Sequence, residues 1–525
     1  ADGAGSGAAI TDVLDVLGGT GNIALGSGAM GVALTTGTDN VAIGENALDA
    51  VTSGTENTAV GDNAAGAITT GADNVAVGSA ALLLNSTGNR NIAIGAGALD
   101  ANTTTHYNVA VGDNSLGANT GTGNIGIGDA ALTSNTTANY NVGVGFEVLK
   151  ANTTGTQNTA VGGNALDANT TGSYNVALGT DALTAATTAS YNTALGRRAG
   201  YALTTGAENV AIGYLALYTA TTAANNVAVG TSALQANTSG TDNVAVGDRS
   251  LDANTTGSDN TAIGDNALGA NTTGADNVAV GSAALLLNST GDYNVAVGSI
   301  ALDAATTADK NTAIGYAALS AATTGASNTA VGYGALSTST TASNNTAVGD
   351  AALAANTSGT DNVGVGANAL DANTTGSDNT AIGDNALGGN TDANNNTAVG
   401  SSALLANTTG GSNVAIGKSA LEDNTGATGN TAVGYGAARE TTTGASNTAI
   451  GYLALDDNTT GASNTAVGFQ ALDASNANNN TAMGYAALGA NTTGASQVAI
   501  GAYALDANTT GDTNVAIGYA ALGSN

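Results

Sequence analysis

The sequence predicts an all-β fold, namely a β-solenoid (β-roll) of about thirty coils of 17 residues each. The element Asn-(Val/Thr)-Ala-(Val/Ile)-Gly, with similar residues replacing one or two of its members in some copies, starts first at Asn22 and last at Asn514 and occurs thirty times. Of the 29 intervals between successive starts, 26 are 17 residues, one is 18 and two are 16. Such constancy indicates one structural unit per repeat. The 525 residues include only 15 Tyr and 2 Phe, and no Trp, Cys or Pro, so we expect a thin core of small aliphatic side chains.

Positions 1 to 5 of the repeat, Asn-(Val/Thr)-Ala-(Val/Ile)-Gly, predict a short strand that ends in a turn. Position 5 is Gly in all thirty copies, which predicts a positive φ or a very close backbone approach. Position 4 is aliphatic in every copy, and we expect this side chain to be buried throughout. Because adjacent strand residues point to opposite faces, position 3, always Ala or Gly, should face the cramped inside of a narrow coil.

Positions 8 to 15, typically Ala-Leu-Asp-Ala-Asn-Thr-Thr-Gly, predict a second buried layer followed by a return turn. Leu at position 9 should supply that layer. Asn and Asp side chains bond locally to the backbone, and we expect Gly at position 15 to supply left-handed geometry. A helix is the competing interpretation of Ala-Leu-Asp-Ala, but the apolar element is too short and is bounded by Gly each time.

Asn at position 1 predicts an amide ladder, because equivalent residues of successive coils would stack about 4.8 Å apart. Only Gln497, another amide, interrupts the series. Representative ladder residues are Asn57, Asn74, Asn91, Asn243, Asn260 and Asn277.

The repeats resemble those of known fibrous proteins. Val41-Ala42-Ile43-Gly44 and its copies resemble the Val-Ala-Ile-Gly repeats of trimeric autotransporter adhesin heads, whose repeat is shorter than 17 residues. The string from Asn260 to Gly274 resembles repeats of tail-fibre-like bacterial and phage proteins. The resemblance covers nearly the whole chain after residue 21. It implies a β-roll in which three chains pack around a common axis, and a role in surface attachment or as a fibre shaft.

The chain divides into residues 1–21, which are outside the repeat pattern, and a predicted solenoid of thirty repeats over residues 22–525. Apolar residues at roughly helical spacing in the first segment would either cap the first coil or dock another subunit, with equal weight. The last coil ends without a polar capping element. Solenoid ends are open strand edges, so we expect this end to be truncated, cleaved or stacked on a neighbouring subunit in a head-to-tail filament.

Four aromatic residues occupy position 6 in four successive coils, and they form a candidate ligand-contact stripe. They are Tyr435, Tyr452, Phe469 and Tyr485. Such a stripe would offer a sugar-binding platform, or it would shield a turn or a subunit contact. Arg197 and Arg198 interrupt an otherwise acidic surface, and they would lie in a solvated turn or at a partner-docking spot.

The charge balance limits the possible partners. Eight basic residues stand against 39 acidic ones, for a formal net charge of −31, which disfavours nucleic acid and anionic membrane surfaces. No stretch approaches the ~18 apolar residues of a membrane helix, so we expect no membrane insertion. The chain begins at Ala1 without Met, which leaves export open as a hypothesis, and the lack of Cys leaves the redox compartment unassigned.

We expect no cofactor, no metal site and no catalytic residues. Asp recurs at positions 6, 10 and 17, so stacked carboxylates could bind structural Ca²⁺ between coils. The calcium-roll motif Gly-Gly-x-Gly-x-Asp is missing, however, and solvated carboxylates are the expected outcome. His106 is the single histidine, and we expect a turn residue there. A carboxylate that recurs in successive coils belongs to the repeat pattern, whereas a catalytic acid or base would be a single residue with a shifted pKa.

These observations favour a structural subunit of an elongated extracellular fibre or filament on a cell or virion surface, and they disfavour an enzyme. Its expected partner is itself, as a homotrimer or a head-to-tail filament. The alternative is an adhesin or phage tail-fibre segment that binds a host receptor or glycan through the aromatic stripe.

Overall fold

The computed structural model describes residues 20–31 and 33–523, and the chain divides into two compact units, Ala1–Asp259 and Asn260–Asn525. The described residues contain strands and turns and no helix, so the predicted all-β solenoid is confirmed. Each coil contributes one three-residue strand, formed by positions 2 to 4 of the repeat. Apart from residues 20 and 21, the predicted N-terminal segment 1–21 lies outside the described residues.

The first unit contains fourteen of the strands. They are β1 (Ile23–Leu25), β2 (Val41–Ile43), β3 (Thr58–Val60), β4 (Val75–Val77), β5 (Ile92–Ile94), β6 (Val109–Val111), β7 (Ile125–Ile127), β8 (Val142–Val144), β9 (Thr159–Val161), β10 (Val176–Leu178), β11 (Thr193–Leu195), β12 (Val210–Ile212), β13 (Val227–Val229) and β14 (Val244–Val246).

The second unit contains sixteen strands of the same length. They are β15 (Thr261–Ile263), β16 (Val278–Val280), β17 (Val295–Val297), β18 (Thr312–Ile314), β19 (Thr329–Val331), β20 (Thr346–Val348), β21 (Val363–Val365), β22 (Thr380–Ile382), β23 (Thr397–Val399), β24 (Val414–Ile416), β25 (Thr431–Val433), β26 (Thr448–Ile450), β27 (Thr465–Val467), β28 (Thr481–Met483), β29 (Val498–Ile500) and β30 (Val515–Ile517).

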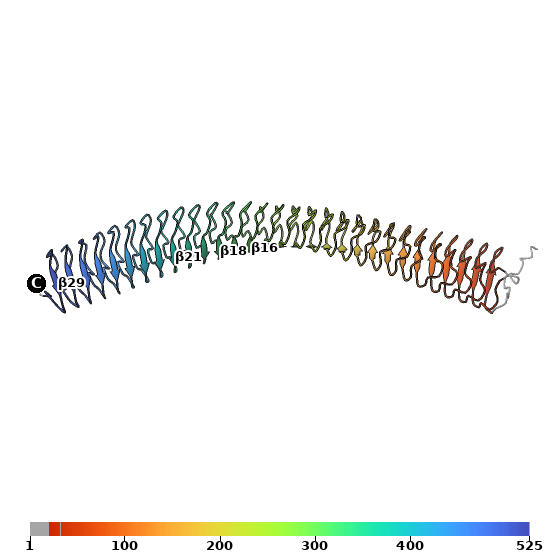
Figure 1. Cartoon of the computed structure of the whole chain (residues 1–525), viewed down its shortest axis with the longest axis horizontal. Helices are drawn as coiled ribbons and strands as arrows, with labels where there is room; N and C mark the ends of the chain where they lie inside the picture. Colours follow the sequence, from red (N-terminus) through yellow and green to blue (C-terminus); the bar gives the residue numbers. More distant parts are fainter. Residues whose placement is uncertain (1–19, 32, 524–525) are drawn as a thin grey trace, which may run out of the picture. The chain divides into compact units, whose positions relative to one another are not determined.

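Within each unit, every strand pairs in parallel with the strand of the next coil, and equivalent positions lie opposite each other. In β2 and β3, Ala42 pairs with Ala59, and the flanking residues pair position for position. Figure 1 shows the arrows of successive coils side by side and pointing the same way within each unit. The in-register stack follows from the constant repeat length, because each coil returns the chain to the same position of the repeat. It also places like side chains in columns.

Glycine at position 5 ends each strand for two physical reasons, and both were predicted. Its φ lies between +127° and +146° in all thirty copies, a region that other residues rarely adopt. A Cβ on Gly44 would also lie 2.4 Å from the carbonyl oxygen of Gly61 in the next coil. The turn therefore excludes any side chain.

The interior of the coil is thin and consists mainly of Ala and Leu. Ala42 at position 3, Ala47 at position 8 and Leu48 at position 9 are each fully buried, and the same positions are buried in nearly all other coils. The predicted inward position 3 and the predicted Leu layer are thus confirmed. The Val and Ile of position 4 do not belong to this core.

The predicted left-handed glycine at position 15 is wrong. Gly54 does not have a positive φ; instead, a Cβ there would approach the carbonyl oxygen of Gly71 to 2.5 Å. Because the backbone is not left-handed, the position accepts Ala where the neighbouring coil adjusts, as at the buried Ala138 and Ala189. The left-handed residues of the coil are non-glycine: Asn46, Leu48 and Glu56, at positions 7, 9 and 17, have φ of 53°, 50° and 58°.

Candidate functional site

The side chains of positions 2 and 4 form an exposed aliphatic face on the outer side of each strand stack. The expectation that position 4 is buried throughout is wrong: Ile43 is 37% exposed and Leu25 is 50% exposed. The reason is that position 3 fills the narrow interior, and the alternation of the strand then directs positions 2 and 4 outward. We refer to these two columns as the aliphatic face.

The aliphatic face has no charged residue in any coil. Position 2 is Val, Thr or Ile, and position 4 is Val, Ile, Leu or Met, in all thirty copies. The acidic residues of the described coils therefore occupy other positions of the repeat. Position 4 forms a continuous aliphatic column, while position 2 is Thr in 13 of the thirty copies. Contiguous apolar surface usually marks an interaction site.

The position 1 amides lie inside the coil, and they connect successive coils through hydrogen bonds. The Asn57 backbone N–H and Nδ2 donate to Oδ1 of Asn40 at 3.1 and 3.0 Å, and Nδ2 also donates to the Gly71 carbonyl at 2.9 Å. Each side-chain amide thus takes the place of a backbone acceptor for the next coil. This arrangement satisfies groups that would otherwise be buried without partners.

The six representative ladder residues all take part in such contacts. Asn74 donates to Asn57, and Asn91 donates to Asn74, with distances of 3.0 to 3.1 Å. In the same way Asn243 donates to Asn226 at 3.0 and 3.2 Å, and Asn277 donates to Asn260 at 3.1 Å.

Position 12 carries a second amide column, which the sequence analysis treated only as turn chemistry. Asn102 Nδ2 donates to Asn85 Oδ1 at 3.3 Å, while Asn85 Oδ1 also accepts the Gly88 N–H at 3.1 Å. These amides are buried. The recurrence of Asn twelve positions into the repeat was the signal that could have predicted this column.

The candidate aromatic stripe is a stack of rings on the surface of the second unit. The centroids of Tyr435, Tyr452, Phe469 and Tyr485 follow each other at 5.2, 5.3 and 5.0 Å with interplanar angles of 12°, 6° and 4°. The rings are 39% to 47% exposed. Because each inner ring has a neighbour on both faces, Tyr452 and Phe469 present their edges to solvent.

Two further tyrosines, which the sequence analysis did not include, extend this stripe. Tyr503 at position 7 lies edge-on to Tyr485, with centroids 5.2 Å apart and an angle of 60°, and Tyr519 lies 6.0 Å from Tyr503 at 85°. The coil between Tyr485 and Tyr519 has Ala502 at position 6. Tyr503 thus fills the gap that the small residue leaves.

Arg197 and Arg198 lie over tyrosine rings in the first unit. The guanidinium carbon of Arg197 is 5.9 Å from the ring centroid of Tyr214, and that of Arg198 is 5.7 Å from the centroid of Tyr201. Arg198 Nε also lies 3.4 Å from a carboxylate oxygen of Asp181. Cation–π contacts of this kind stabilise exposed turns modestly.

Burial raises the pKa of several position 10 carboxylates above the ordinary range of Asp. The largest effect raises the pKa of Asp456 to about 6, because burial disfavours its charged form, although the adjacent Arg439 opposes the shift. Arg439 Nη2 donates to Asp456 Oδ2 at 3.2 Å, and Nε lies 3.1 Å from Oδ1. Asp456 is only 6% exposed.

Neither a metal-ligand cluster nor a membrane-spanning helix is present in the part of the chain that the structure describes. No group of three or more His, Cys, Asp or Glu residues there could hold a metal ion. None of the same residues forms a helix with the length and apolar character of a membrane span. His106 lies in the turn at position 16, where its Nδ1 accepts the Asn89 backbone N–H at 2.9 Å.

The fold and these columns define a parallel β-solenoid protein with one strand per coil. No family model matches the chain, and no curated protein matches it. The resemblance to adhesin heads and tail fibres therefore rests on the repeat motif alone.

Proposed function

We propose that this chain is a structural subunit of an elongated extracellular fibre or filament on a cell or virion surface, and that copies assemble through their aliphatic faces. The observation that supports the proposal is the continuous, uncharged and half-exposed aliphatic face of positions 2 and 4. A single chain leaves this apolar surface in contact with water, and assembly removes it.

The size of the aliphatic face fits a stable interface. A three-residue strand covers about 10 Å along the chain and about 4.8 Å across it, so the sixteen strands of the second unit present about 770 Å². This area is close to the ~800 Å² that each partner buries in an interface of standard size. The first unit adds a similar face with its own fourteen strands.

A second copy of this chain fits the aliphatic face better than an unrelated protein. The face repeats every ~4.8 Å along the stack, and only a surface with the same period can interdigitate with it over many coils. Another copy of this chain has that period because it consists of the same repeats. Three copies around one axis is the arrangement that the resemblance implies, and head-to-tail stacking of coil ends is a second route to a filament.

The interior supports a mechanical role. Each coil buries an amide that bonds both to its own turn and to the neighbouring coil, so bending the stack would disturb hydrogen bonds in every coil. Such side-chain ladders are a known source of rigidity in stacked parallel strands.

The test is the oligomeric state of the full chain with charges placed in the aliphatic face. Ile263 and Ile314, at position 4, are 41% and 40% exposed. The double variant Ile263→Lys with Ile314→Lys should fold and remain a single chain, because burying two unpaired ammonium groups opposes assembly by several kcal/mol, or at least about 100-fold in affinity. Analytical ultracentrifugation and cryo-electron microscopy would measure the change.

The control variant carries the same two charges in the same two coils. Thr273→Lys with Thr324→Lys places them at exposed position 14, and it should assemble like the unmodified chain. Unmodified chains that stay single at tens of micromolar, or identical assembly of both double variants, would refute the proposal.

The aromatic stripe favours a second candidate function, in which the chain is an adhesin or tail-fibre segment that binds a receptor or glycan. Contact of four stacked, partly exposed rings with water is unfavourable, and a bound ligand would reduce it. Since the stack covers most ring faces, a ligand would contact ring edges and Tyr hydroxyls. Glycan-array binding that is lost in Tyr452→Phe, which keeps the stack but removes one hydroxyl, would support this function; retained binding would exclude the hydroxyl as its contact.

A further inference from the structure

A hollow of about 440 Å³ lies on the first unit over the turns of three successive coils. It is lined by Asp73, Asn89, Arg90, His106 and Tyr107, among others. The volume falls in the range of small-ligand sites. The lining is unusual for this chain, since it contains the only histidine and one of only eight basic residues.

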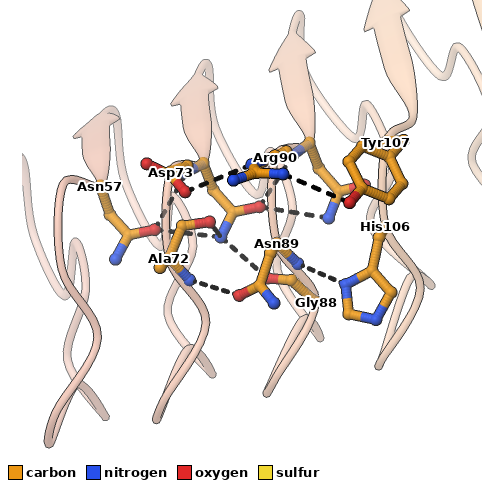
Figure 2. A network of polar contacts seen from close by, with 10 residues as sticks. Asn57, Ala72, Asp73, Gly88, Asn89, Arg90, His106 and Tyr107 are labelled. Carbon is orange, nitrogen blue, oxygen red and sulfur yellow. Dashed lines mark hydrogen bonds and ion pairs between the residues drawn. The ribbon is translucent and has the colours of Figure 1, made fainter.

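The side chains around the hollow are held in place by contacts between coils. Asn89 Oδ1 accepts the Ala72 backbone N–H at 2.7 Å, and His106 Nδ1 accepts the Asn89 backbone N–H at 2.9 Å. Figure 2 shows the two side chains in this arrangement, each beside the backbone of the preceding coil. The two polar groups are therefore preorganised rather than free to rotate.

Arg90 is held on the opposite side of the hollow between two neighbours. Its Nε lies 3.5 Å from Asp73 Oδ2, its Nη1 donates to the Tyr107 hydroxyl at 3.3 Å, and its guanidinium carbon lies 5.8 Å from the Tyr107 ring centroid. Figure 2 shows Arg90 between Asp73 and Tyr107. Arg90 remains largely exposed, with 62% of its side chain accessible.

These contacts leave an excess of hydrogen-bond donors. Because His106 Nδ1 is an acceptor, its Nε2 carries the hydrogen. Neither this Nε2–H, nor Asn89 Nδ2, nor Arg90 Nη2 donates to any group in the described part of the chain. The carboxylate of Asp73 is the one charged acceptor in the lining, and it already pairs with Arg90.

We propose that this hollow binds an acidic sugar, namely a hexuronate unit of a surface polysaccharide. A hexuronate offers a carboxylate for the guanidinium and ring hydroxyls for the amide and imidazole donors, with Tyr107 as an apolar edge. Its many acceptors match the donor excess of the site. Nucleic acid is disfavoured because Arg90 is the one Lys or Arg residue in the lining, whereas nucleic-acid affinity depends on several Lys or Arg contacts to phosphates. This site is separate from the aliphatic face and from the aromatic stripe.

The second unit contains a similar set of residues that serves as an internal control. Tyr293 and Lys310 occupy position 17 in adjacent coils, in the opposite order to Arg90 and Tyr107, and Asp292 and Asp309 stand at position 16. Asp292 Oδ1 accepts the Ala275 N–H at 2.7 Å, so the backbone contact is the same while the free donors are replaced by carboxylates. We expect no hexuronate binding there.

The test uses the full chain and isothermal titration calorimetry with trigalacturonate, with a neutral galactose trisaccharide and acetate as comparison ligands. Trigalacturonate should bind, and the other two should bind at least about tenfold more weakly. Arg90→Gln should reduce trigalacturonate affinity at least about tenfold, because the one cation of the site is lost.

His106→Asp provides a variant whose folding the chain itself supports. Asp309 makes the same backbone contact at position 16, accepting the Asp292 N–H at 2.8 Å, so the substitution keeps the turn, removes the free donor and adds a negative charge to the hollow. It should weaken trigalacturonate binding at least about tenfold, whereas Lys310→Gln should leave it unchanged. No trigalacturonate binding at millimolar concentration, equal binding of acetate, or unchanged affinity in both Arg90→Gln and His106→Asp would overturn the proposal.

Discussion

The strand side of the coil, positions 1 to 5, and the return side, positions 12 to 15, use the same two residue types but tolerate change very differently. Both sides carry a buried amide and a glycine. Position 1 is an amide and position 5 is Gly in every copy, whereas position 12 is also Leu, Val, Ile, Ala, Ser or Thr, and position 15 is also Ala or Thr. The difference lies in whether the backbone N–H that bonds to the side-chain amide has another acceptor when that amide is replaced.

On the return side a substitute exists. Where Val51 replaces the amide, the Gly54 N–H donates to the Thr69 carbonyl of the next coil at 3.2 Å, and Gly206 donates to Thr221 in the same way beside Leu203. On the strand side, the backbone N–H of the position 1 Asn donates to the side-chain amide of the preceding coil, as at Asn57 and Asn74. No neighbouring carbonyl stands in for that oxygen. Residues therefore vary between repeats where the backbone has an alternative hydrogen-bond acceptor, and they stay the same where it has none.

The largest expected effect comes from a substitution that interrupts the amide column at position 1. Asn311→Leu removes the acceptor of the Asn328 N–H and Nδ2, at 2.9 and 3.2 Å, and the donor to the Gly325 carbonyl at 2.9 Å. Three buried groups lose partners, which should destabilise the coil by about 4 kcal/mol. Hydrogen exchange of the neighbouring amides would measure this locally, as repeat proteins open coil by coil. Asn311→Gln should lose less, since the side-chain amide of Gln497 at the same position finds other partners, donating to Asn491 Oδ1 at 2.9 Å and accepting from Asn508 Nδ2 at 2.6 Å.

A comparison of the two glycines should give the next largest effect. Gly315→Ala at position 5 combines a φ of +136° with a Cβ 2.3 Å from the Gly332 carbonyl oxygen, and it should cost about 3 kcal/mol. Gly325→Ala at position 15 would also bring a Cβ close to a backbone oxygen, 2.2 Å from the Ala342 carbonyl. Its φ is not positive, however, and Ala308 and Ala342 occupy the same position in the adjacent coils, so it should cost only about 1 kcal/mol. Equal losses in thermal unfolding of the two variants would contradict the distinction.

The two sides of the coil should also differ in how their stability depends on pH. Positions 1 to 5 carry no titratable side chain, so the strand side should contribute nothing to that dependence. The folded-state pKa of Asp456 at position 10 is raised to about 6 by burial. Protonation is therefore favoured in the folded state, so stability should rise as the pH falls from about 7 toward 4. Arg439→Gln should raise this pKa further, since Arg439 lowers it. NMR titration of the Asp456 carboxyl would show the shift, and a fall in that pKa would contradict the assignment.

The smallest expected effect comes from the return-side column. Asn288→Leu removes two donor contacts, to Asn271 Oδ1 at 2.9 Å and to the Gly291 carbonyl at 3.0 Å, while Asn288 Oδ1 already lacks a partner. We expect a loss under about 1 kcal/mol, with added apolar burial as compensation. A loss as large as that of Asn311→Leu would show that the return side is not redundant.

Much of the fold could be predicted from the sequence because repetition removes the usual ambiguity of short patterns. The strand positions, the glycine turn and the Leu layer each recur thirty times, so one physical argument holds for every coil. The aromatic stripe could be located for the same reason, by reading position 6 down the repeats. The hollow around Arg90 could not, because it depends on which side-chain atoms remain free after neighbouring coils have bonded.

The sequence by itself determined the coil length and the in-register stacking, since a nearly constant period brings the same repeat positions together in successive coils. Only the tertiary structure decided that Ile43 and its column face outward. The alternation of a strand says that positions 3 and 4 lie on opposite sides, but not which side is the interior. The width of the coil settled that, because its narrow interior holds Ala and amides and leaves no room for a second column of branched side chains.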